Sequence, residues 1–141
     1  MKRILATITV AVTLVASSAS AFDPEDLKKL KETKECMVCD LSGANLTNAN
    51  LTRANLRGAN LTSAKLTGAN LIRANLRGAK LTDAKLSRAY LNGAKLTGAI
   101  MNGAKLSGAN LKGAILDYTI MDGAILCNTT MPDGSDIYSG C

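Results

Sequence analysis

Four cysteines are the residues whose type and spacing point most directly to chemistry. Cys36 and Cys39 form a C-x-x-C motif, and Cys127 and Cys141 lie near the end of the chain. A redox motif of this kind belongs to a thioredoxin-like pattern, which the sequence lacks. Haem attachment needs His where Asp40 stands, and a zinc site needs four ligands in one place. The cysteines therefore suggest disulfides, and we expect no metal or cofactor.

Catalytic side chains are poorly represented. The chain contains no His, so the numerous Ser and Thr residues have no evident base to activate them. Asp83 lies in a region rich in Lys and Arg, and Asp117 and Asp122 are isolated carboxylates. We expect a protein that is not an enzyme.

Cations are the second chemically distinctive group. The formal net charge is +6, and residues 40–131 contain eleven Lys and Arg against four Asp. They could form an anion-binding surface, or they could be a solvated face that keeps the protein soluble. The candidate anion or partner surface comprises Lys65, Lys85, Lys105, Arg88, Arg53, Arg73, Arg57 and Arg77.

The elements that position these cations follow a sequence pattern that repeats every five residues. Leu or Met recurs at every fifth position from Leu41 to Met131, which makes nineteen units, and Ala precedes most of them by two residues. This period suits neither a helix nor a flat strand. It is explained if the chain turns a corner once per unit, so that four corners close a square coil of 20 residues. At a strand spacing of about 4.8 Å, the stack is roughly 23 Å tall.

The interior of such a coil must be small and regular, because the chain has one Phe and no Trp. Centre residues and the preceding Ala point inward, and Gly two residues after a centre suits a tight corner. The predicted core residues are Leu46, Leu51, Leu56, Leu61, Leu66, Leu71, Leu76, Leu81, Leu86, Leu91 and Leu96.

Repeated A-N-L-T-x and A-K-L-T-G units resemble the pentapeptide-repeat family. The C-x-x-C-D-L-S-G-A-N-L start at 36–46 and the T-T-M-P-D-G-S end at 129–135 resemble the flanks of exported bacterial members. The resemblance implies an all-β fold, a right-handed quadrilateral β-helix, over residues 40–131. Some members imitate DNA and bind gyrase, which implies an acidic surface. Because the repeat body here is basic and export is expected, gyrase is not an expected partner. Nucleic acid is not expected either, since export separates the protein from it and only Tyr90 could offer stacking among the cations.

Both ends of the coil need covering, because open strand edges invite aggregation. Residues 22–39 are expected to form an N-terminal cap with a short helix over 23–35, and Phe22 and Val38 could help to cover Leu41. Residues 132–141 are expected to form a C-terminal capping tail.

The height of the stack restricts the disulfide pairing. The two cysteine regions lie about 20 Å apart, whereas a disulfide spans about 4–7 Å between Cα atoms. Only Cys36–Cys39 and Cys127–Cys141 fit one monomer, and the sequence leaves open whether Cys36–Cys39 is oxidised.

Residues 20 apart in sequence stack on the same wall of the coil. Lys65, Lys85 and Lys105 then share one wall with Arg88 alongside. The pair Arg53 and Arg73 falls on the next wall, and the pair Arg57 and Arg77 on a third. Ile100, Ile115, Ile120 and Ile125 each precede a centre and could form a contact patch, although packing beneath the C-terminal tail is favoured.

Residues 1–21 have the features of a signal peptide. A basic start at Lys2 and Arg3 precedes the apolar run 4–15, and Ala19 and Ala21 form an A-x-A cleavage pattern. An uncleaved anchor is the alternative. We expect export to the periplasm or the extracellular space, or to the thylakoid lumen if the host is photosynthetic, which also suits a disulfide-bonded chain.

These features favour a non-catalytic structural or protein-interaction solenoid outside the cytoplasm. The partner is an unidentified protein, and the chain is a monomer or an end-to-end dimer. The alternative is a binder of anionic envelope polymer, such as a glycan, or of lipid headgroups through the Lys and Arg ladders.

Overall fold

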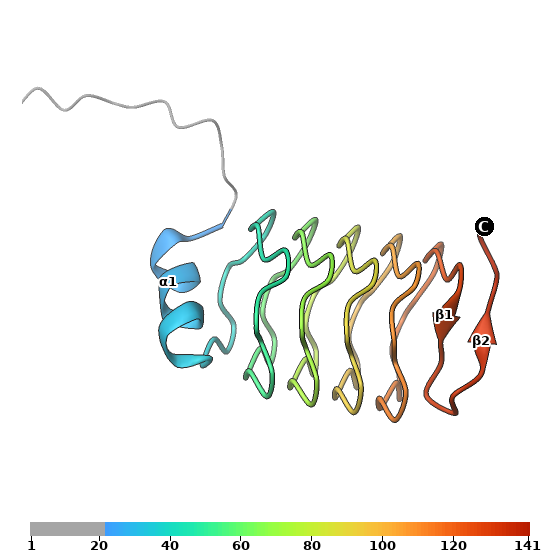
Figure 1. Ribbon diagram of the computed structural model, residues 1–141. Coiled ribbons are helices and arrows are strands. Elements are labelled where there is room, and N and C mark those ends of the chain that lie inside the picture. Colours follow the sequence, from blue (N-terminus) through green and yellow to red (C-terminus); the bar gives the residue numbers. More distant parts are fainter. Residues whose placement is uncertain (1–21) are drawn as a thin grey trace, which may run out of the picture.

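A computed structural model of the chain describes residues 22–141, so the predicted signal peptide lies outside the described part. Helix α1 (Pro24–Thr33) lies across one end of a stack of coils, and the short strands β1 (Thr129–Thr130) and β2 (Asp136–Ile137) lie at the other end (Figure 1). The stack is a right-handed, four-sided β-helix, which confirms the predicted fold class.

Parallel β-bridges join residues 20 apart and hold the coils together. Leu76, for example, donates its N–H to the carbonyl of Lys95 at 2.8 Å, and Lys95 donates to Ala74 at 2.9 Å. Each bridged column runs up one wall, and we name the walls by their columns. They are the lysine wall (Asn45, Lys65, Lys85, Lys105, Ile125), the asparagine wall (Asn50, Asn70, Tyr90, Asn110, Thr130), the arginine wall (Glu35, Asn55, Asn75, Lys95, Ile115) and the isoleucine wall (Asp40, Asn60, Lys80, Ile100, Ile120).

The core is a column of Leu side chains lined by Ala. Every Leu predicted for the core, from Leu46 to Leu96, is at most 2% exposed, and the Ala residues from Ala54 to Ala109 that precede the centres are equally buried. Leu therefore fills the middle of each coil, and Ala leaves room for the four walls to approach one another.

Each corner lies two residues after a centre and has left-handed backbone angles. Gly58 has a φ of 66°, and Arg53 occupies the corresponding corner with a φ of 58°. The following Ala closes the turn, as when Ala54 donates to the carbonyl of Leu51 at 3.0 Å. Side chains at the corners consequently point outward, whatever their polarity.

The N-terminal end is capped much as the sequence suggests. Asp23 accepts a hydrogen bond from the N–H of Glu25 at 2.8 Å, Leu30 is buried, and Phe22 and Leu27 pack against the core. The helix ends at Thr33 rather than at residue 35, because Lys34 adopts a left-handed conformation with a φ of 59°.

The bridged ladder starts at Glu35, five residues before the expected start of the repeats at 40. Cys36 takes a centre position and is fully buried. Val38 therefore falls at a corner, where it is 79% exposed. The expectation that Val38 covers Leu41 was wrong, because a corner directs its side chain outward.

Two disulfides are present in the structure. Cys36–Cys39 has a Cα–Cα distance of 5.3 Å, and Cys127–Cys141 has one of 4.9 Å. The first bridge lies in the first coil, and the second ties the end of the chain back to the last coil.

The C-terminal tail covers only part of its end of the stack. Strands β1 and β2 pair antiparallel over the asparagine wall, and Gly140 lies against Ile125. On the other two walls, the N–H groups of Leu116 and Met121 have no hydrogen-bond partner among residues 22–141. Ile115 and Ile120 are exposed, so the expected packing beneath the tail holds for Ile125 and not for these two.

Among residues 22–141, no helix has the length and apolar character needed to cross a membrane.

Candidate functional site

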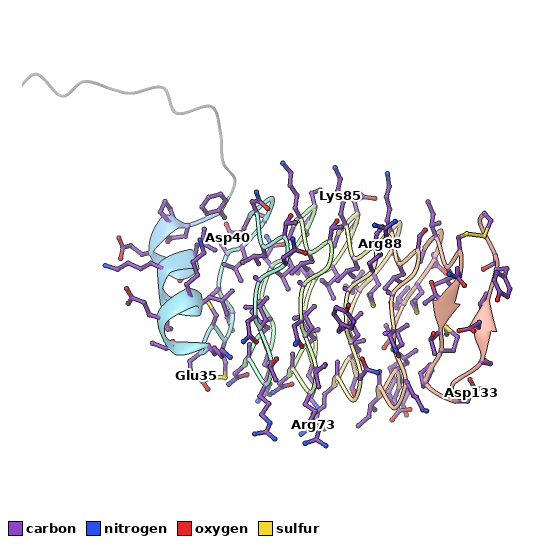
Figure 2. All side chains as sticks on the ribbon, viewed as in Figure 1. Glu35, Asp40, Arg73, Lys85, Arg88 and Asp133 are labelled. Atoms are coloured by element: carbon purple, nitrogen blue, oxygen red, sulfur yellow. A yellow bond between two sulfur atoms is a disulfide. The ribbon has the colours of Figure 1, made fainter. Side chains whose placement is uncertain are left out.

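All eight predicted anion-binding residues lie on the exposed surface, but the coil does not bring them into one site. The lysine and arginine walls are two corners apart within each square coil and therefore face opposite directions. Lys85 and Arg73 accordingly point away from opposite sides of the stack (Figure 2). The eight residues divide into one set on each side.

The lysine wall carries the first set. Lys65, Lys85 and Lys105 are directly bridged to one another, so their side chains repeat at the coil spacing of about 4.8 Å. Arg88 occupies the adjoining corner with a φ of 58°. The result is a row of cations with one per coil.

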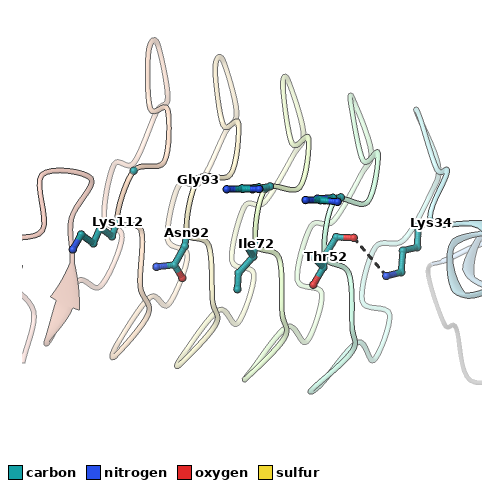
Figure 3. Close-up of a pocket in the computed structure, with 9 residues that line it drawn as sticks. Lys34, Thr52, Ile72, Asn92, Gly93 and Lys112 are labelled. Atoms are coloured by element: carbon teal, nitrogen blue, oxygen red, sulfur yellow. Dashed lines mark hydrogen bonds between the residues drawn. The ribbon is translucent and has the colours of Figure 1, made fainter.

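Two residues of the second set, Arg53 and Arg73, border a groove at the corner between the asparagine and arginine walls, which we call the corner groove. Its volume is about 550 Å³. It is lined by Lys34, Thr52, Arg53, Ile72, Arg73, Asn92, Gly93, Lys112 and Gly113. Figure 3 shows Lys34 and Lys112 at opposite ends of this row, with Thr52, Ile72 and Asn92 between them.

The groove exists because the corner column changes from arginine to glycine. Arg53 and Arg73 occupy two successive corners, and Gly93 and Gly113 occupy the next two. The Cγ atom of Arg73 lies 3.4 Å from where a Cβ on Gly93 would stand, so the arginine extends over the glycine. Missing side chains at the two glycines leave the space open.

The groove has a strongly positive lining. Four of its nine residues are cationic and none is acidic. The ammonium of Lys34 lies 3.5 Å from the carbonyl oxygen of Thr52, which holds this half-buried side chain at the end of the groove. Such a lining suits an extended anionic chain that also offers hydrogen-bonding groups and an apolar contact for Ile72.

Sequence reasoning identified Arg53 and Arg73 but missed Lys34 as part of this site. Lys34 is one residue out of register with the corner column of Arg53 and Arg73, which repeats every 20 residues. The repeat period therefore assigns Lys34 to the N-terminal cap and not to this column. Only the left-handed turn at the end of α1 brings its side chain beside Thr52.

Arg57 and Arg77 do not line the corner groove. They border a second hollow of about 330 Å³ on the arginine wall, together with Met37, Val38, Gly58 and Gly78. This hollow combines two guanidinium groups with exposed apolar side chains, because the disulfide-bonded turn presents Met37 and Val38 to the outside.

Within residues 22–141, one cluster brings together potential metal ligands, namely Asp26, Cys36 and Cys39. The two sulfur atoms are joined to one another, so neither is a thiolate ligand. The Asp26 carboxylate accepts the N–H of Asp40 at 2.8 Å. In this oxidised form the cluster serves to attach helix α1 to the first coil.

The carboxylates considered for catalysis remain separate. Asp83, Asp117 and Asp122 are exposed. In the tail, hydrogen bonds from the Ser135 hydroxyl and N–H lower the pKa of Asp133 below its ordinary value, which suits a turn rather than an acid or base.

The bridged coil and the inward Leu and Ala side chains define the class as a β-solenoid repeat protein. The family model for pentapeptide repeats matches residues 39–78, 74–113 and 102–131. The chain belongs to the pentapeptide-repeat family. Proteins of this family are generally structural or interaction proteins.

Solved structures of other pentapeptide repeat proteins are similar to this chain. One from the Arabidopsis thaliana thylakoid lumen is 32% identical over 64% of this chain and 59% of its own, with a TM-score of 0.50. Another, from the cyanobacterium Cyanothece, is 30% identical over 71% of this chain and 92% of its own, with a TM-score of 0.44. This chain thus matches little more than half of the lumenal protein. A search of curated protein sequences gives no match.

Proposed function

We propose that the protein is a non-catalytic interaction solenoid outside the cytoplasm, and that an acidic segment of a partner protein binds in its corner groove. The lining of that groove carries the proposal: four cations and no carboxylate surround a hollow of about 550 Å³. A groove favours an extended segment, because the segment can meet Arg53 and Arg73 in successive coils and Lys112 two coils further on, while excluding water from the contact.

A location outside the cytoplasm is supported by two disulfides, which persist in oxidising compartments. The signal-like residues 1–21 and the similarity to a thylakoid lumen protein support it as well. Gyrase stays outside the proposal, because a mimic of DNA presents acidic walls and this repeat body presents basic ones. Nucleic acid stays outside it because export separates the protein from nucleic acid.

A second candidate function is the binding of an anionic envelope polymer or of lipid headgroups. The observation in its favour is the directly bridged row of Lys65, Lys85 and Lys105, which offers one cation per coil. A long polyanion can follow such a row without needing a hollow. Binding of this kind weakens steeply as salt screens the charges.

Affinity capture from the envelope fraction of the native host tests the proposal. The bait is the mature, disulfide-bonded protein, compared with a variant that combines Arg53→Gln, Arg73→Gln and Lys112→Gln. The matched control combines Lys65→Gln, Lys85→Gln and Lys105→Gln, which removes the same number of charges from the opposite wall.

A protein retained by the wild type and by the control, but lost from the groove variant, supports the interaction function. The second candidate is supported if the wild type retains an anionic glycan rather than a protein, and if the lysine-wall variant loses that glycan. Equal retention by all three baits would exclude both cationic surfaces.

A further inference from the structure

Exposed apolar side chains gather on the arginine wall. Seven large apolar residues are exposed among residues 22–141, and four of them lie on this wall or at the corner between it and the isoleucine wall. Met37 and Val38 are 54% and 79% exposed at its N-terminal end, and Ile115 and Tyr118 are 39% and 89% exposed at its C-terminal end. Since 80 residues separate Val38 from Tyr118, only the stacking places them on one edge.

The backbone at both ends of this edge adopts a conformation that their side chains disfavour. Val38 and Tyr118 each have a φ of 57° at corners where Gly58, Gly78 and Gly98 stand between them. A β-branched residue is rarely found in this region, and strained residues of this kind concentrate at functional positions. The core gains nothing from either side chain, because both point to solvent.

Cations occupy the middle of the same wall. Arg57 and Arg77 border the hollow beside Met37 and Val38, and Lys95 stands further along the bridged column. Four coils separate the two apolar ends, which is about 19 Å at the strand spacing. The coils are stacked in line (Figure 1), so the wall has apolar groups at each end, beside the exposed carboxylates of Glu35 and Asp117, and positive charge between them.

We infer that the arginine wall docks the protein on an anionic lipid bilayer, with Met37, Val38 and Tyr118 entering the headgroup region and Arg57 and Arg77 meeting phosphate groups. This inference rests on the lipid arm of the second candidate function and moves it from the lysine wall to the arginine wall. Tyr is suited to a lipid interface because one end of its ring is apolar and the other is polar. Arginine keeps its charged head at the phosphates while its stem lies along apolar groups.

The distribution of apolar groups favours a bilayer over a protein surface. Protein interfaces concentrate apolar residues at the centre and place charges around the rim. The arginine wall has the reverse order, since its apolar groups are at the two ends and its cations are central. A flat bilayer can accommodate both ends of a straight wall at once.

Sedimentation of the mature, oxidised protein with lipid vesicles tests the inference. Vesicles of phosphatidylglycerol mixed with phosphatidylcholine should bind the protein, and vesicles of phosphatidylcholine alone should bind it much less. Val38→Gly and Tyr118→Gly should each weaken binding to the mixed vesicles by about tenfold, as loss of a buried apolar side chain implies. Arg57→Gln and Arg77→Gln should each weaken it by about fivefold.

The glycine substitutions separate binding from folding. Glycine adopts a positive φ freely, so both variants should unfold no more easily than the wild type. Asn48→Gly is the matched control, because it makes the same change at a φ of 56° on the diagonally opposite corner. A variant combining Lys65→Gln with Lys85→Gln removes two cations from the opposite wall and should retain most of the binding.

The inference is overturned if the wild type does not bind the mixed vesicles, or if the lysine variant loses as much binding as the arginine variants. It is also overturned if the protein does not bind vesicles and the Val38→Gly and Tyr118→Gly variants lose a protein that the wild type retains in affinity capture. The wall would then bind a protein partner. None of these variants alters the lining of the corner groove, so the proposed protein interaction can fail or survive independently.

Discussion

Gly78 offers a direct measurement of what the corners contribute to the stability of the coil. Its φ is 65°, and a Cβ atom built on it would have no neighbour within 4 Å. Gly78→Ala therefore changes the backbone preference without creating a clash. A non-glycine residue in the left-handed region costs about 1–2 kcal/mol. The reduced freedom of the unfolded chain returns about 0.4–1 kcal/mol. We expect the free energy of unfolding to fall by about 1 kcal/mol.

Urea unfolding followed by circular dichroism measures this loss, with an unchanged slope against urea showing that the folded and unfolded states remain comparable. Ser63→Gly is the reverse control, because Ser63 occupies an exposed corner with a φ of 56°. It should raise the free energy of unfolding. Unchanged or increased stability in Gly78→Ala would contradict the corner geometry.

Gly68 extends the test to a corner where space is also limited. A Cβ there would collide with the side-chain oxygen of Asn48 in the neighbouring coil. Gly68→Ala should therefore be more destabilising than Gly78→Ala. Adding Asn48→Gly to Gly68→Ala removes the colliding atoms. The double variant should therefore lose no more free energy of unfolding than Gly78→Ala does. If the second substitution restores no stability, the two corners do not interact.

Three further predictions concern the core, the tail and its pH dependence. Leu76→Ala should lower the free energy of unfolding by about 2–5 kcal/mol in urea titrations, because Leu76 is fully buried and the narrow coil cannot collapse around the cavity; a loss below 1 kcal/mol would contradict the packing. Replacing both Cys127 and Cys141 by Ser should cost about 3 kcal/mol in the same assay, since the bridge closes a tail of 14 residues, and amide exchange should accelerate over β1 and β2. Asp133→Asn should reduce stability at neutral pH and have no effect well below pH 3.8. The Ser135 hydrogen bonds depress the pKa of Asp133 in the folded protein, so its contribution is present above 3.8 and is lost as the pH falls through the folded-state pKa; an equal effect at both pH values would contradict this.

Much of the fold could be predicted because the repeat is redundant. Each Leu centre and each Ala experiences the same surroundings in every coil, so one periodic pattern specifies the core from Leu46 to Leu96 and the corners between them. The cysteine pairing followed as well, because the height of the stack separates the two ends of the chain.

The ends of the stack were harder to predict because they break the repeat. Lys34 ends the helix in a left-handed turn, and Cys36 then takes a centre position before any Ala-containing unit begins. That shift moved Val38 from an expected covering role to an exposed corner. At the other end, the tail pairs over the asparagine wall and leaves the N–H groups of Leu116 and Met121 unpaired within residues 22–141.

The sequence by itself determined the coil, its core and the columns in which the cations stack, since a period of five residues and a return after four corners require no long-range information. Tertiary structure decided which side chains share a surface. It placed the lysine and arginine sets on opposite walls, joined Lys34 to Arg53 in one groove, and aligned Val38 with Tyr118 on one edge. The physical reason is that exposure and proximity depend on where each corner directs its side chain and on what the irregular ends cover, and neither is repeated along the chain.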